Sequence, residues 1–274
     1  MNTKNYSDWI MVSDIDGTLN NTMRRTPKVN TDAISDFVHN KGGHFTLASA
    51  RNVQSLKPHY DNLPDVRTPA IILNGAGIYD YENNKMLWFN PLPSEGIDVI
   101  SKAMKKFPNL EVGIFTQDMI YLVRPKISAP FMMAIDSLRH KKVRSISEVP
   151  MGSWGKVIFY CMPWNKKKIR DFVVAESDES LAFIDTSAFS FDMVAGDTNK
   201  GTAVKKLAEI LGISEDKTCA IGNYYNDLDM LKAVKHSACC KQAPEDIHNL
   251  CEYTACHCND GAVADFISYI YNTY

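Results

Sequence analysis

The sequence lacks a long apolar run, and none of its 274 residues lie in a segment long enough to span a bilayer, which needs roughly 20 apolar residues. Near the N-terminus, Asp8, Asp14 and Asp16 interrupt the apolar stretch before the hydrophobic region of a signal peptide could form. We therefore expect a cytoplasmic protein that does not enter a membrane.

The sequence also lacks a strong charge of either sign and the paired C-x-x-C spacing of a structural zinc site. A formal net charge of −2 gives no basic field for nucleic acid. Seven cysteines, an odd number in a chain this long, are typical of a reducing compartment rather than of a disulfide framework. Six Cys and His residues crowd near the C-terminus and suggest zinc, but buried free thiols are the favoured interpretation. They are Cys239, Cys240, Cys251, Cys256, His257 and Cys258.

What the sequence does have is an apolar run at residues 9–18, WIMVSDIDGT, that ends in two carboxylates and a glycine. This pattern predicts a buried strand that breaks into a turn, with Asp14 at the carboxyl edge of a sheet. Alternation in an extended segment puts Asp14 and Asp16 on one side, close enough to share a divalent cation. Two alternatives are an ordinary Asp and Gly turn and the metal-diphosphate site of a sugar-nucleotide transferase.

The order of the predicted elements indicates a doubly wound parallel sheet, an α/β fold. Helices are expected at residues 26–41 and 52–63, and strands at 44–49 and 70–73. The alternation of helices and strands resumes near the C-terminus. Helices are expected there at 200–211, 228–234, 244–250 and from 261 onward, and strands at 218–222 and 237–240.

Between these two regions the pattern changes to hairpins mixed with helices. Strand signals occur at 77–80, 86–89, 112–115, 120–123, 156–161 and 181–186, and helix signals at 97–107, 130–139 and from 165. This mixture of hairpins and helices predicts an α+β cap, residues 82–190, inserted into a Rossmann-like core of residues 1–81 and 191–274. The lysine-rich runs of the insertion are interpreted as solvated faces.

Four motifs occur in a fixed order, DIDGT, LASAR, NKG and GNYYND, and three of them follow predicted strands. Asp14, Ser49 and Asn223 therefore fall at one edge of the predicted sheet. Together the motifs, with ILNGAGIYD and NDGAVADFI, resemble the haloacid dehalogenase (HAD) superfamily of phosphohydrolases. Within it, the chain resembles the Cof-type branch, in which an α+β cap lies between the second and third motifs.

The resemblance implies a Mg²⁺-dependent phosphatase that acts on a small phosphorylated metabolite, such as a sugar phosphate. Asp14 would attack phosphorus and form an aspartyl phosphate, and Asp16 would protonate the leaving alcohol. Ser49, Lys200 and Asn226 would contact the phosphoryl oxygens. Lys200 at a helix start is informative by itself, because the helix dipole disfavours a cation there unless an anion lies nearby.

One departure concerns the metal. The fourth motif of the family usually begins Gly-Asp, and here it reads Gly222-Asn223. The implied metal ligands are Asp14, Asp16, Asn223 and Asp227, and Asp227 is expected either to act through a metal-bound water or to pair with Lys200. Because a carboxylate has become an amide, we expect a weaker Mg²⁺ site.

Arg51 and Asn74 are weaker candidates, either substrate contacts or structural hydrogen-bonding residues at strand ends. Two other functions stay open. A phosphomutase or phosphosugar synthase would share every site residue, and a non-catalytic phosphometabolite-binding protein is compatible with Asn223. The transferase alternative weakens, because it explains neither Lys200 nor GNYYND.

Overall fold

The computed structural model describes residues 5–126, 129 and 138–274, which divide into two compact units. The core unit comprises Met1–Ala50, Leu56–Leu87 and Asn199–Tyr274, and the second unit comprises Arg51–Ser55 and Trp88–Thr198. The second unit therefore ends about eight residues beyond the expected cap, and the hairpin after residue 77 belongs mostly to the core unit. The helix expected at 130–139 lies largely outside the described residues. No helix among the described residues is long and apolar enough to cross a membrane.

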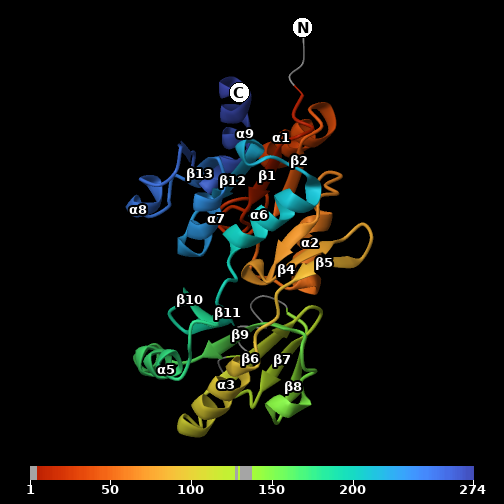
Figure 1. The fold of residues 1–274 in the computed structure, drawn as a ribbon. Coiled ribbons are helices and arrows are strands. Elements are labelled where there is room, and N and C mark those ends of the chain that lie inside the picture. The colour runs from red at the N-terminus through yellow and green to blue at the C-terminus, as the bar shows by residue number, and fades with distance from the viewer. Residues whose placement is uncertain (1–4, 127–128, 130–137) are drawn as a thin grey trace. The chain divides into compact units, whose positions relative to one another are not determined.

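The core unit contains a five-stranded parallel sheet with the strand order β14-β13-β12-β1-β2 (Figure 1). The strands are β1 (Ile10–Ser13), β2 (His44–Leu47), β12 (Thr218–Gly222), β13 (His236–Cys240) and β14 (Tyr253–Ala255). From β1 the chain continues to β2 on one side, whereas β12, β13 and β14 follow each other on the opposite side. This reversal confirms the predicted doubly wound α/β fold.

Helices of the core unit cover this sheet, and two pairs of them pack together, α1 with α9 and α6 with α7. They are α1 (Lys28–Ser35), continued by a π-helical turn (Asp36–Asn40), α2 (Val53–Asp61), α6 (Lys200–Leu211), α7 (Leu228–Ala233), α8 (Glu245–His248) and α9 (Ala262–Thr273). The first three residues of α2 group with the second unit by their contacts. All were expected within a few residues, including α2, which retains Pro58 in its interior.

The third expected parallel strand pairs differently. β3 (Ala70–Ile72) touches the parallel sheet through the isolated bridge between Ala48 and Ile71, and otherwise forms an antiparallel sheet with β4 (Gly77–Asp80) and β5 (Lys85–Phe89). The prediction of a strand was right, but most of its pairing is with the hairpin that follows it. A tight turn brings β4 back beside one edge of β3, while the other edge meets the chain after β2 at Ala48.

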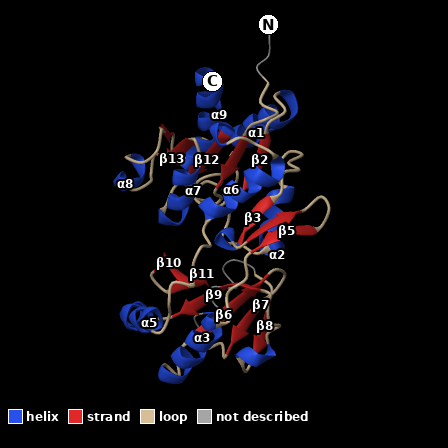
Figure 2. Cartoon of the chain, viewed as in Figure 1, coloured by secondary structure: helices blue, strands red, loops and turns tan. Residues whose placement is uncertain are grey.

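The second unit is an α+β fold around a six-stranded sheet with the order β10-β11-β9-β6-β7-β8, antiparallel except for β7 and β8 (Figure 2). Its strands are β6 (Glu111–Thr116), β7 (Ile120–Val123), β8 (His140–Val143), β9 (Trp154–Tyr160), β10 (Leu181–Ser187) and β11 (Ser190–Ala195). Its helices α3 (Glu95–Lys106) and α5 (Pro163–Ala175) contact each other. Alternate residues such as Ile114, Phe159 and Phe191 build its apolar core.

Three short strands were not predicted: β8, β11 and β14. β8 reads HKKV and carries the lysines that we interpreted as a solvated face. β14 has only three residues, too few to show a period of two. β11 alternates Phe191 and Met193 with Asp192, and that buried acid obscured the pattern of a strand.

Candidate active site

The carboxyl end of β1 is where the strand order reverses, and this is where ligands bind in doubly wound sheets. Ser13, the last residue of β1, pairs with Ile221 on one side and Leu47 on the other. Asp14 follows directly, and its backbone N–H donates to the carbonyl of Ile221 at 3.0 Å. Asp14 therefore lies between the loops that follow β2 and β12.

Lys200 joins the first and last motifs. It is the first residue of α6, and its Nζ donates to Asp14 Oδ1 and to Asp227 Oδ1, both at 2.6 Å. Its side chain is 1% exposed, so the ammonium is surrounded by protein. Asn199 caps the helix by accepting from the backbone N–H of Thr202 at 2.8 Å. A buried cation bridging two carboxylates is the arrangement that the position of Lys200 at a helix start indicated.

Asp227 is fully buried and uses both of its carboxylate oxygens. While Oδ1 accepts from Lys200, Oδ2 accepts from the backbone N–H groups of Asn223 at 2.9 Å and Tyr224 at 3.2 Å. A Cβ on Gly222 would lie 2.6 Å from the Cβ of Asp227, so the chain needs glycine there. Of the two roles expected for Asp227, the geometry shows the pairing with Lys200.

The surroundings of this cluster raise the pKa values of both Asp14 and Lys200. Burial, followed by the neighbouring charge of Asp227, raises the pKa of Asp14 to about 7 even though Lys200 acts in the opposite direction. Burial alone would lower the pKa of Lys200, but the two carboxylates outweigh it and hold that pKa above its usual range. The lysine therefore stays charged, whereas Asp14 is poised to take up a proton near neutrality.

The DIDGT loop is locked onto Asn223. Gly17 has φ of 80°, and a Cβ there would lie 2.6 Å from the Nδ2 atom of Asn223. The buried hydroxyl of Thr18 donates to Asn223 Oδ1 at 3.1 Å. Asp16, between them and Asp14, has an exposed side chain. The loop thus places one buried and one exposed carboxyl at the same strand end.

The remaining predicted residues lie in different surroundings. Ser49 is buried, and its backbone carbonyl accepts from the N–H of Asn74 at 2.9 Å, so these two residues are adjacent. Asn74 has φ of 58° and is 1% exposed. Asn226 is half-buried in the turn Tyr225–Asp227. Arg51 belongs to the second unit by its contacts.

The donor set suits a hard cation. Asp14, the backbone of Asp16 and the amide of Asn223 supply only oxygen atoms, which Mg²⁺ prefers. Asn223 Oδ1 already accepts from Thr18, but a carbonyl oxygen has a second lone pair. Within the described residues, no three His, Cys, Asp or Glu side chains are arranged to hold a metal. The site is therefore poorer in carboxylates than the expected ligand list.

Two supporting residues were missed. Thr18 lay within the motif and could have been recognised by its hydroxyl, whereas Gln242 had no local signal. The Nε2 atom of Gln242 donates to the carbonyl of Gly17 at 2.6 Å, and its Oε1 accepts from the backbone N–H of Cys258 at 3.2 Å. Gln242 thus ties the DIDGT loop to the C-terminal segment.

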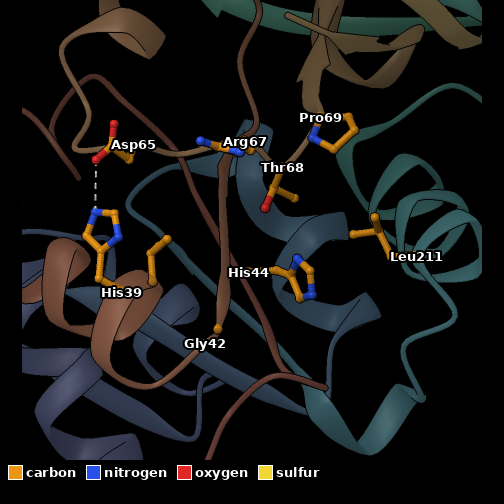
Figure 3. A pocket seen from close by; sticks show the side chains of 10 residues that line it. His39, Gly42, His44, Asp65, Arg67, Thr68, Pro69 and Leu211 are labelled. Carbon is orange, nitrogen blue, oxygen red and sulfur yellow. Dashed lines mark ion pairs between the residues drawn. The ribbon is translucent and has the colours of Figure 1, made fainter. Parts of the chain in front are cut away.

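A cavity of about 450 Å³ lies beside His44, the first residue of β2 (Figure 3). His44, Arg67 and Thr68 line it, and His39 Nε2 lies 3.2 Å from Asp65 Oδ2 at its rim. The predicted catalytic residues do not line this cavity, so it is separate from the candidate active site.

Comparison with known proteins supplies independent information. A profile of haloacid dehalogenase-like hydrolases matches residues 11–267. A Buchnera aphidicola protein named "Putative phosphatase" is 28% identical over 251 residues, which are 84% of this chain and 82% of that protein.

Two solved structures share the fold. A haloacid dehalogenase-like hydrolase from Bacteroides thetaiotaomicron has a TM-score of 0.86 and 18% identity, covering 96% of this chain and 99% of the other. A sugar phosphatase of HAD subclass IIB has a TM-score of 0.80 and 17% identity, covering 98% and 99%. The likeness therefore extends over both units.

Proposed function

Because the chain belongs to the haloacid dehalogenase-like hydrolases, and is a phosphatase of their Cof-type branch, we propose that it hydrolyses a phosphate monoester through an aspartyl phosphate on Asp14. The observation that carries this proposal is the buried bridge of Lys200 between Asp14 and Asp227. Such a bridge fixes the Asp14 carboxylate at the strand end and keeps positive charge beside it. Phosphoryl transfer needs both, a positioned nucleophile and neutralised charge.

The reaction begins at Asp14. One carboxylate oxygen forms a bond to phosphorus as the bond to the alcohol oxygen breaks, and the phosphoryl group stays on Asp14. Lys200 holds the carboxylate in place and, with the hydroxyl of Ser49 and the amide of Asn226, stabilises negative charge on the phosphoryl oxygens.

Asp16 acts as the general acid and then as the general base of the reaction. Its exposed side chain can reach the oxygen of a leaving group, which the buried Asp14 would not do while it carries the phosphoryl group. As a carboxylic acid it donates a proton to the departing alkoxide. As a carboxylate it then takes a proton from the water that attacks the aspartyl phosphate, which releases phosphate and restores Asp14.

Mg²⁺ would be held by Asp14, the backbone carbonyl of Asp16 and the amide oxygen of Asn223, and when bound it supplies positive charge that favours the ionised nucleophile and neutralises the substrate. Asp227 supports this site by holding the backbone N–H of Asn223. With Asn223 in place of a carboxylate, the site depends more on the charge that the phosphate itself brings.

We assign the second unit as a cap that supplies substrate contacts, with a small phosphorylated metabolite as substrate and a sugar phosphate as the favoured class. The sugar phosphatase that shares the fold supports this choice.

The test is a hydrolysis screen over phosphorylated metabolites with and without Mg²⁺, with Asp14→Asn as the control. We expect Mg²⁺-dependent release of phosphate by the native protein and none by the variant. Brief incubation with substrate and acid quenching should also trap a phosphoryl group on the peptide that contains Asp14. If the native protein binds phosphate esters without hydrolysing any and forms no aspartyl phosphate, the proposal is wrong.

A further inference from the structure

The DIDGT turn contains a glycine that the chain needs and that would leave the turn loose by itself. Gly17 has φ of 80°, and a Cβ there would lie 2.6 Å from Asn223 Nδ2, so the turn requires glycine. Glycine also gives the backbone more freedom than any other residue. Asp16 directly precedes it and has an exposed side chain. The direction of the Asp16 side chain therefore depends on what holds Gly17 in place.

Asp14 is held independently of Gly17. Its backbone N–H donates to the carbonyl of Ile221 at 3.0 Å, in the neighbouring strand β12. Its carboxylate accepts from Lys200 Nζ at 2.6 Å. A loss of order at Gly17 would therefore affect Asp16 more than Asp14.

The peptide group between Gly17 and Thr18 is held at both of its polar atoms. The N–H of Thr18 donates to the carbonyl of Ile15 at 3.3 Å, within the turn. The carbonyl of Gly17 accepts from Gln242 Nε2 at 2.6 Å, and Gln242 lies between β13 and α8. Because the bond within the turn is long for an N–H···O hydrogen bond, the bond from Gln242 is the firmer restraint on this peptide group.

Gln242 is itself oriented by a second contact. Its Oε1 accepts at 3.2 Å from the backbone N–H of Cys258, which begins the short turn Cys258–Asp260 before α9. Cys258 is one of the cysteines considered for zinc, and its thiol is free. A backbone N–H only donates and a carbonyl only accepts, so these two partners define which end of the amide faces Gly17. The donor therefore reaches Gly17 with its orientation already set.

We propose that Gln242 is a positioning residue that acts through Gly17 and keeps the carboxyl of Asp16 directed at the leaving group. This inference rests on the proposed phosphatase function, in which Asp16 is the general acid. A hydrogen bond from outside the turn restrains a glycine that the close approach of Asn223 makes necessary. Gln242 acts on the acid rather than on the nucleophile, because Asp14 has anchors of its own.

The test compares kcat/KM for p-nitrophenyl phosphate, which has a good leaving group, with kcat/KM for the sugar phosphate that the native protein hydrolyses fastest. This constant covers the steps up to the departure of the alcohol, so it reports acid catalysis. Gln242→Glu keeps the shape of the side chain and the acceptor for Cys258 but loses the donor for Gly17. The loss for the sugar phosphate should exceed the loss for p-nitrophenyl phosphate by about three- to tenfold, the range that one neutral hydrogen bond supports.

The action through Asp16 is tested by repeating the comparison in Asp16→Asn. Asparagine has no proton to give, so the direction of residue 16 no longer affects departure of the alcohol. Gln242→Glu should then change the ratio of the two esters by less than about twofold. A change of about threefold or more in that background would show that Gln242 acts without Asp16, and equal losses for both esters in Gln242→Glu alone would show a merely structural contact. Either result overturns the proposal.

Two matched controls accompany these variants. Lys241→Gln lowers the charge beside Gln242 by one unit, as Gln242→Glu does. Thr22→Val removes one exposed hydrogen bond between the same parts of the chain, from the Thr22 hydroxyl to Asn259 Oδ1 at 3.1 Å. Both controls should leave the ratio of the two esters unchanged. If Lys241→Gln shifts the ratio as much as Gln242→Glu, charge explains the effect and the proposal is wrong.

An NMR measurement without substrate tests whether the bond from Gln242 forms in solution. The amide nitrogen of Thr18 belongs to the same peptide group as the carbonyl of Gly17, so its resonance should shift in Gln242→Glu and stay in place in Thr22→Val. An unchanged resonance in Gln242→Glu would also overturn the proposal. If the native protein hydrolyses neither ester, the phosphatase function itself is wrong and the positioning role falls with it. If it hydrolyses both and the ratio does not respond to Gln242→Glu, only the role of Gln242 is wrong.

Discussion

Replacing Asp14 by asparagine is expected to abolish turnover and, at the same time, to stabilise the metal-free protein at pH 8. The reason is that the folded protein holds the Asp14 carboxyl in an environment that disfavours its charge, which raises its pKa from 3.8 to about 7. Asparagine keeps the shape of the side chain and removes that charge. The ionised Asp14 carboxyl would thus lower the stability of the folded protein while it supplies the nucleophile of the reaction.

The magnitude follows from linkage. The folded state retains the proton of Asp14 up to pH of about 7, whereas the unfolded chain loses it near pH 4, so stability falls as pH rises between these values. A shift of about three units corresponds to about 4 kcal/mol, reached above pH 7 and absent below pH 4. The hydrogen bond from Lys200 is already part of this net value.

The assay is denaturant unfolding in EDTA at pH 4.5 and pH 8, with and without Asp14→Asn. Both proteins carry phenylalanine in place of Trp88, Trp154 and Trp164, so that the fluorescence of Trp9 reports on the core unit alone. The variant should be more stable by about 2–4 kcal/mol at pH 8 and by no more than about 1 kcal/mol at pH 4.5. A variant that is less stable than the native protein at pH 8 would refute the reasoning, because Asp14 would then stabilise the fold as an anion.

Three further changes address the other site residues. Lys200→Met should destabilise the core unit by about 3–5 kcal/mol in denaturant unfolding, since it leaves the carboxylates of Asp14 and Asp227 buried without a cation; an unchanged midpoint would contradict the bridge. Asp16→Asn should slow hydrolysis of sugar phosphates far more than that of activated aryl phosphates, and equal losses in kcat would argue against its role as the acid. Asn223→Asp should lower the Mg²⁺ concentration for half-maximal activity, and unchanged metal affinity in calorimetry would mean that residue 223 is not a ligand.

The sequence was informative about the site wherever the signal was local. Asp14 followed an apolar run, and Lys200 stood at a helix start where only an anionic partner explains a cation, and the structure shows that partner. By contrast, the contact of Gln242 with Gly17 joins residues 225 positions apart. No periodicity records such a contact, because it depends on how separate loops meet at one sheet edge.

The same distinction holds for the fold. Strands with continuous apolar runs, such as β1 and β12, were predictable because both faces are buried. β8 was not, because its lysines resemble a solvated loop. The pairing of β3 was not, because an apolar run predicts a strand without saying which strand lies at each of its two edges. The position of a strand could be deduced, but its partner could not.

The position of β1 between β2 and β12 sets the order of events when the chain is synthesised. Its partner around Leu47 leaves the ribosome early, but its partner around Ile221 follows only after the whole second unit. At 5–20 residues per second, one edge of β1 waits roughly 10–40 s for its neighbour. During that interval Asp14 has no Lys200 or Asp227 beside it, and an apolar strand edge is open to other chains. A chain that stops before Asp227 is therefore expected to be both inactive and prone to aggregate, because the site needs Lys200 and Asp227 beside Asp14.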